Sequence, residues 1–94
     1  MSNSVIWFEV IGADGEALKN FYSKTFDWQI DSNNPMNYGI VNTGSEKGIQ
    51  GGIGGSNEGM KGATFYIGVD DLKAHLETVE ANGGKVIGTV RNFV

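Results

Sequence analysis

The sequence of 94 residues contains no cysteine, one proline and one histidine. A chain without cysteine has no disulfide framework and no thiolate, either as a nucleophile or as a metal ligand. This composition fits a reducing compartment, and we expect a cytoplasmic protein. The first ten residues, MSNSVIWFEV, have neither a basic segment nor a long apolar run. We therefore expect no signal peptide and no membrane-spanning segment.

Basic residues are also scarce. Lys and Arg together number 7, against 11 Asp and Glu, and the formal net charge is −4. The basic residues are scattered along the chain, whereas neutralising nucleic-acid phosphates requires clustered Lys and Arg. We therefore expect no nucleic-acid partner. The hydrophobic content of 39% and the charged content of 19% are typical of a globular domain, and this length allows one domain with a modest core.

The chain does contain an internal repeat. Residues 5–30 align with residues 62–87 at a shift of 57 positions, the distance from Asp14 to Asp71. Each copy reads as an alternating strand, an acidic residue placed to cap a helix, an amphipathic helix and a second strand. A repeat of this length predicts two copies of one supersecondary unit.

The pattern also predicts the remaining elements. Strands are expected at residues 5–11, 38–43, 49–53, 63–69 and 85–90, with a short one ending at Ile30. The first helix follows Asp14, and the second follows Asp70 or Asp71 and ends at the turn Asn82-Gly83-Gly84. The first unit is then βαβββ, while the second stops at βαβ. We predict a single domain over residues 1–94, with module one at about 5–55, a linker at about 54–61 and an incomplete module two at about 62–94.

Helical spacing predicts which residues form the core beside the first helix. The expected stripe consists of Ala17, Leu18, Phe21, Tyr22 and Thr25. It should pack on the strand face that carries Phe8, and we interpret Phe26 and Trp28 as core residues as well. In the second helix the expected stripe is Leu72, Leu76 and Val79, with His75 at its margin.

Five short motifs suggest a family. They are Trp7-Phe8-Glu9-Val10 followed by Asp14, Phe21-Tyr22, Phe26-Asp27-Trp28, Gly51-Gly52-Ile53, and Val69-Asp70-Asp71-Leu72 ending in Gly83-Gly84. In this order the sequence resembles the glyoxalase/bleomycin resistance/dioxygenase superfamily, also called the vicinal oxygen chelate proteins. The resemblance implies an α+β fold in which two βαβββ modules form curled mixed β-sheets around a cavity. Here the second module would be truncated to βαβ.

The resemblance also implies where a metal would bind. Metal-dependent members take a ligand from the first strand of each module, seven residues before the acidic residue that starts the helix. Those positions hold Trp7 and Thr64. Indole has no lone pair to offer, and threonine is a poor ligand for a divalent transition metal. The histidine, His75, falls in the second helix. We therefore predict no metal ligand, no cofactor and no catalytic residue.

Alternation places Trp7, Glu9, Thr64 and Tyr66 on the strand face turned away from the helices. The resemblance implies that this face lines the cavity, which would make these residues ligand-binding, with Gln50 as a further candidate. The other interpretation is that Trp7 and Tyr66 fill a core while Glu9 meets solvent. Glu9 as a general base lacks an evident acid or base partner. The run GGIGG at residues 51–55 lacks the Lys-Ser/Thr of a phosphate-binding loop, and close strand packing explains it better.

These observations favour a metal-independent small-molecule-binding protein, with a partly aromatic or cationic ligand. The alternative is a divalent-metal-dependent lyase, isomerase or dioxygenase of the same superfamily with non-standard ligands. A sheet that ends two strands short leaves open backbone edges and apolar surface. We therefore expect a homodimer in which a second chain completes the half-barrel, with strand exchange as one route.

Overall fold

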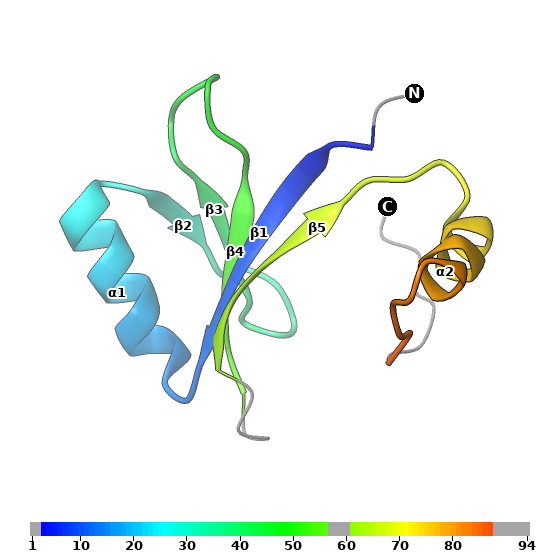
Figure 1. Ribbon diagram of the computed structural model, residues 1–94. Helices are drawn as coiled ribbons and strands as arrows, with labels where there is room; N and C mark the ends of the chain where they lie inside the picture. Colours follow the sequence, from blue (N-terminus) through cyan, green and yellow to red (C-terminus); the bar gives the residue numbers. More distant parts are fainter. Residues whose placement is uncertain (1–2, 57–60, 88–94) are drawn as a thin grey trace. The chain divides into compact units, whose positions relative to one another are not determined.

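The computed structural model describes residues 3–56 and 61–87, which form an α+β fold with a mixed sheet (Figure 1). Along the chain the elements are β1 (Val5–Gly12), α1 (Gly15–Phe26), β2 (Gln29–Asp31), β3 (Gly39–Asn42), β4 (Gly51–Gly55), β5 (Gly62–Ile67) and α2 (Leu72–Ala81). Neither helix has the length and apolar composition needed to cross a membrane. The chain divides into two compact units, residues 5–67 and, together, residues 1–4 and 68–94.

The larger unit, residues 5–67, contains the whole sheet, in the order β2-β3-β4-β1-β5. Strand β1 is parallel to β4, while the other neighbouring pairs, β1–β5, β2–β3 and β3–β4, are antiparallel. The β1–β5 pair aligns Glu9 with Thr64 and Trp7 with Tyr66, and its register shifts between Val5 and Trp7. This arrangement brings together the strands that begin the two repeats of the sequence.

Helix α1 begins directly after Asp14, as predicted from the sequence. The Asp14 carboxylate accepts a hydrogen bond from the Ala17 backbone N–H at 3.0 Å and so caps the helix. The helix ends at Asp27, which has a φ of 61° in the left-handed region. Helix α1 follows β1 and precedes β2 in the chain, and it packs against β4, β1 and β2 (Figure 1).

Helix α2 lies in the second unit, and Asp71 rather than Asp70 caps it. The Asp71 carboxylate accepts a hydrogen bond from the Ala74 backbone N–H at 3.1 Å. After the C-cap Asn82, Gly83 has a φ of 94°, which confirms the left-handed helix stop. The strand predicted at 85–90 is not found at residues 85–87, and residues 88–90 lie outside the described part of the chain.

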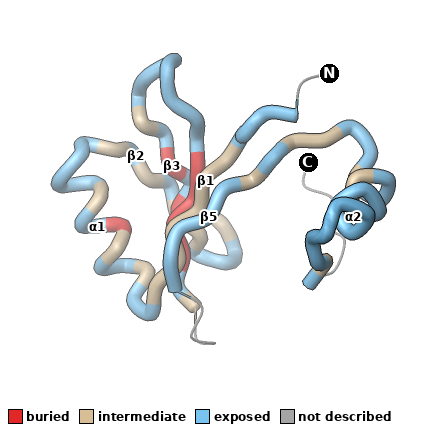
Figure 2. The backbone as a smooth tube through the Cα atoms, in the orientation of Figure 1, coloured by how far each residue is buried: buried red, intermediate tan, exposed pale blue. Residues whose placement is uncertain are grey.

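The apolar core of the described residues is small. Val41 and Ile53 are completely buried, and Figure 2 shows the buried positions gathered in the middle of the sheet, with one more on α1. That position is Lys19, which is only 7% exposed. A buried lysine was not predicted, and it shifts the face that α1 turns to the sheet.

The predicted α1 stripe is therefore partly wrong. Leu18 and Tyr22 are half-buried as expected, whereas Ala17 and Thr25 are exposed. Phe21 and Phe26 are 54% and 55% exposed, so they are not core residues. Both rings still belong to an aromatic cluster with Tyr22 and Trp28, in which Tyr22 and Trp28 stack at 5.2 Å between centroids. The apolar residues on α1 cover more than one face, so spacing alone did not fix which face packs.

Candidate functional site

The two faces of the sheet differ in chemistry. On the α1 side, Phe8 packs its ring against Trp28, with 5.5 Å between centroids. On the opposite side, which we call the Glu9 face, β1 presents Trp7 and Glu9, and β5 presents Thr64 and Tyr66. The structure thus places four of the five predicted ligand-binding residues on one face of the larger unit. The fifth, Gln50, directly precedes β4.

Glu9 is the centre of a hydrogen-bonded cluster on this face. Tyr38 donates its hydroxyl to Glu9 Oε2 at 2.8 Å, and Tyr66 donates its hydroxyl to Glu9 Oε1 at 3.0 Å. The Trp7 indole Nε1–H donates in turn to the Tyr38 hydroxyl at 3.3 Å. We call these four residues the Glu9 cluster. Each carboxylate oxygen therefore accepts a phenol proton, which fixes the orientation of the carboxylate between three aromatic side chains.

The hydroxyl of Tyr38 remains protonated across the physiological range. Burial raises the pKa of Tyr38 to about 12, and the hydrogen bond to the Glu9 carboxylate acts in the same direction. The hydrogen bond from Trp7 opposes the shift but does not cancel it. Tyr38 is therefore a constant hydrogen-bond donor to Glu9 and is unsuited to act as a general base near neutral pH.

Glycines in β4 make room for Tyr38. A Cβ at Gly52 would overlap the hydroxyl and ring of Tyr38, and a Cβ at Gly54 would lie 3.2 Å from its Cδ1. On the other face, a Cβ at Gly51 would overlap the ring of Phe8. The glycine run predicted to serve close packing therefore lets an aromatic ring lie flat on each side of the strand.

Tyr38 is also held at its backbone. The Asn34 side chain accepts from the Tyr38 N–H at 3.0 Å and donates to the Tyr38 carbonyl at 2.6 Å. The preceding residue, Asn37, accepts from the buried Lys19 Nζ at its carbonyl at 2.6 Å. Lys19 Nζ also pairs with Glu16 at 2.8 Å. Asn37 Nδ2 donates to the same Glu16 oxygen at 3.0 Å. These bonds fix the loop before β3 to α1.

The loop contacts have an electrostatic signature at Glu16. The hydrogen bond from Lys19, followed by the one from Asn37, lowers the pKa of the Glu16 carboxyl below its ordinary value of 4.5. The Glu16 carboxyl is therefore ionised at neutral pH, and its hydrogen bonds from Lys19 and Asn37 tie the loop that carries Tyr38 to α1.

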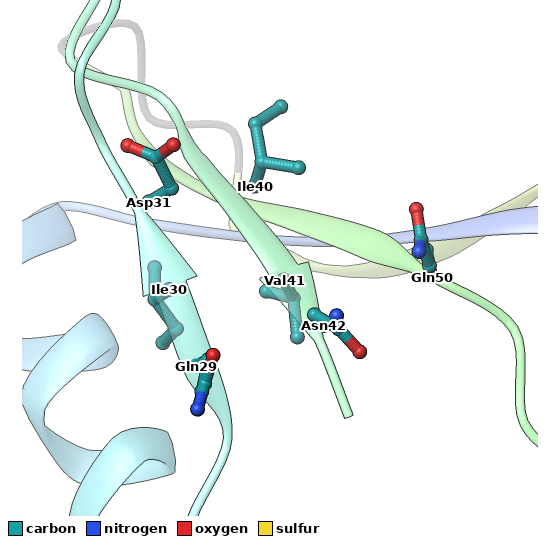
Figure 3. Close-up of a pocket in the computed structure, with 7 residues that line it drawn as sticks. All are labelled: Gln29, Ile30, Asp31, Ile40, Val41, Asn42 and Gln50. Carbon is teal, nitrogen blue, oxygen red and sulfur yellow. The ribbon is translucent and has the colours of Figure 1, made fainter. Parts of the chain in front are cut away.

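A pocket of about 360 Å³ lies beside the cluster, on β2, β3 and the start of β4 (Figure 3). Its polar lining residues are Gln29, Asp31, Asn42 and Gln50, and its apolar lining residues are Ile30, Ile40 and Val41. In Figure 3, Ile40 and Gln50 project from one side of the strands, whereas Ile30 lies on the side nearer the helix. Gln50 therefore contributes to this pocket, and no hydrogen bond joins its side chain to the Glu9 cluster in the described structure.

The side chains at the expected metal-ligand positions do not fit a divalent metal. Trp7 uses its indole N–H as a donor to Tyr38. Thr64 is exposed beside Glu9, whose two oxygens both accept phenol protons. Across residues 3–56 and 61–87, no group of three or more His, Asp or Glu side chains is arranged to hold a metal ion.

Sequence reasoning missed Tyr38, the residue that links Trp7 to Glu9. The usable signal was the position of a tyrosine at the start of a strand, together with glycines at alternate positions of another strand. Such a pair is typical of an aromatic ring lying on a glycine backbone. Without the pairing of β3 with β4, nothing in the sequence connects the two.

Comparison with known proteins identifies the family. No family model matches the chain. The chain is 38% identical over 91 residues to a glyoxylase-like domain-containing protein of Didymella fabae, and the match covers 87% of this chain and 70% of that relative. The βαβββ order of β1 to β4 and the mixed sheet are consistent with this relationship. The chain therefore belongs to the glyoxalase-like proteins of the vicinal oxygen chelate superfamily.

Proposed function

We propose that this protein binds a small molecule on its Glu9 face without a metal ion. The observation that supports this most strongly is the Glu9 carboxylate, which is held by two tyrosine hydroxyls beside an indole ring. Small-molecule sites combine apolar and aromatic walls with a few oriented polar groups. The Glu9 cluster has this composition.

The cluster favours a ligand that is partly aromatic or cationic. The rings of Trp7, Tyr38 and Tyr66 provide flat apolar surface, and their electron-rich faces attract a cation. Glu9 adds a negative charge whose oxygens already accept hydrogen bonds. A cation can therefore be attracted by the charge without having to replace a hydrogen bond. Thr64 and Gln50 lie beside the cluster on the same face.

We also propose that two copies of the chain associate. Strand β5 is an edge of the described sheet, and its residues Phe65 and Ile67 are 61% and 51% exposed. An open strand edge with large apolar side chains is commonly covered in the native assembly. A symmetric dimer, with or without strand exchange, would cover it. A monomer in light scattering at micromolar concentration would contradict this arrangement.

Thermal unfolding with a library of small molecules tests the binding function. The screen is run with a chelator and repeated with added manganese or zinc, because a ligand that binds the folded state raises the midpoint. We expect hits in the chelator, and we expect Glu9→Gln to weaken them while Glu46→Gln, which removes an exposed charge in the turn after β3, does not. Hits that require the metal, or stoichiometric metal in native mass spectrometry, would instead favour a metal-dependent lyase, isomerase or dioxygenase.

A further inference from the structure

The pocket beside the Glu9 cluster contains a row of carboxamides. The sequence has two glutamines, Gln29 and Gln50, and both line this pocket together with Asn42. We call these three residues the carboxamide row. In the described structure, the side chains of Gln29 and Gln50 make no hydrogen bond. Asn42 uses only its Oδ1, which accepts from the Gly44 backbone N–H at 2.9 Å.

The register of the sheet continues this row into the Glu9 cluster. Gln29 pairs with Asn42 across β2 and β3. Gly51 pairs with Val41 of β3 on one side and with Phe8 of β1 on the other. Gln50 is one residue before Gly51, so the same registers place it between Asn42 and Trp7. The hydrogen bond from the Phe8 N–H to the Gln50 carbonyl, at 3.3 Å, supports this alignment. Trp7 in turn pairs with Tyr66.

Five side chains therefore cross the sheet in one line on the Glu9 face, one from each strand or its immediate start. In order they are Gln29, Asn42, Gln50, Trp7 and Tyr66. Neighbouring strands lie about 4.8 Å apart, a spacing that a single six-membered ring with its substituents can bridge. The three carboxamides span two such spacings, about 10 Å, so their flexible side chains can contact one small ring together, and the indole lies one spacing beyond Gln50.

We propose that the carboxamide row binds an uncharged, hydroxyl-rich group of the ligand, such as a sugar ring or a cyclic polyol. This inference rests on the proposed binding role of the Glu9 face and names the chemistry of the ligand there. A carboxamide offers both donors and an acceptor, and so does a hydroxyl group, so each can satisfy the other in either direction. A row of carboxamides next to an indole suits a ring with polar edges and an apolar face.

The charges on this face exclude anionic ligands, the main competing class. The described strand residues on the Glu9 face include the carboxylates Asp31 and Glu9 and no Lys, Arg or His. A phosphate or carboxylate group would meet repulsion and would find no cationic partner. A cationic group of the ligand would be drawn to Glu9 rather than to the carboxamide row, where it would leave the carboxamide acceptors and donors only partly used. A neutral polyol uses them fully.

Side-chain amide signals in NMR test the inference. The two glutamine NH₂ pairs and that of Asn42 are followed while methyl β-glucoside, methyl α-mannoside or myo-inositol is added. We expect saturable shifts in all three pairs with at least one of these probes, and no shift for Asn20, an exposed carboxamide on α1. Gln50→Leu should weaken the affinity at least several-fold, while Asn20→Leu should not change it.

Three outcomes would overturn the inference. In the first, no probe shifts the carboxamide row at millimolar concentration. In the second, the shifts persist unchanged in Gln50→Leu while the two indole signals show that this variant is folded. In the third, choline shifts the Trp7 indole and leaves the carboxamides unmoved. This last result would refute the hydroxyl-rich ligand but would support the proposed binding function, so the two failures can be told apart.

Discussion

Replacing Gly52 by alanine should disrupt the Glu9 cluster although none of its four residues is substituted. The added Cβ would occupy the space of the Tyr38 hydroxyl and ring. Gly52 does not need a left-handed backbone, so alanine meets no conformational barrier there. The ring of Tyr38 must therefore move off β4, which breaks its hydrogen bonds to Glu9 and Trp7.

The size of the effect follows from those two bonds. A hydrogen bond to a charged group contributes about 1.5–3 kcal/mol and a neutral one about 0.5–1.5 kcal/mol, and we take the lower end because the cluster is half-buried. Replacing glycine by alanine returns about 0.4–1 kcal/mol through the entropy of the unfolded chain. We expect Gly52→Ala to lower the free energy of unfolding by about 1–3 kcal/mol, allowing for lost packing of the ring.

Urea unfolding followed by tryptophan fluorescence measures this change. Gly48→Ala is the matched control, because a Cβ there would meet only Thr43 Oγ1, at 3.4 Å. The ultraviolet absorbance of tyrosinate gives a second readout. The Tyr38 pKa should fall from about 12 toward its ordinary value of 10 in Gly52→Ala. The reasoning fails if Gly52→Ala matches Gly48→Ala in stability and keeps the wild-type tyrosine titration.

Three further predictions concern the groups that hold the cluster. Because burial raises the pKa of Tyr38 from 10 to about 12, its contribution to stability is complete below about pH 10 and is lost as the pH rises toward 12. Stability curves should therefore show a fall over that range that is smaller in Tyr38→Phe, and equal falls would contradict the assignment. Lys19→Met should destabilise the protein by about 1–3 kcal/mol, because the Asn37 carbonyl loses its partner. Since the folded pKa of Glu16 is lowered, its contribution is present above pH 4.5 and is lost as the pH falls through the folded pKa. The acid-induced loss should be shallower in Lys19→Met, and an unchanged acid profile would refute the pairing. Asn34→Ala should shift the Tyr38 and Trp7 signals in NMR while leaving Trp28 unmoved, because Asn34 bonds both backbone groups of Tyr38; unmoved Trp7 and Tyr38 signals would show that Asn34 does not position the ring.

Local patterns in the sequence were enough to predict much of the fold. The alternation of β1 and β5 was enough to place Trp7, Glu9, Thr64 and Tyr66 on one face, because strand periodicity does not depend on distant residues. Helix starts at Asp14 and Asp71 were likewise local, since a cap bonds an N–H three residues away. The relationship to glyoxalase-like proteins was visible for the same reason.

Long-range contacts account for what the sequence did not reveal. Tyr38 lies 29 positions from Glu9, and its role depends on how β3 pairs with β4. The burial of Lys19 could not be predicted, because a lysine is rarely buried unless it is paired and its partner Asn37 is 18 positions away. Once Lys19 turns toward the sheet, Phe21, which lies about 200° further around the helix, is left exposed. The line of side chains from Gln29 to Tyr66 needed the register of four strand pairs.

The two tryptophans allow the central claim to be measured most directly. Trp7 belongs to the Glu9 cluster, whereas Trp28 stacks on Tyr22 and packs at a tilt against Phe8 on the α1 side of the sheet. An NMR titration of the two indole N–H signals, run in a chelator with hits from the thermal screen, therefore compares the two faces within one sample. The proposed metal-independent site predicts saturable shifts of the Trp7 signal with Trp28 unmoved. Shifts of Trp28 alone, or shifts of Trp7 that disappear in the chelator, would contradict it.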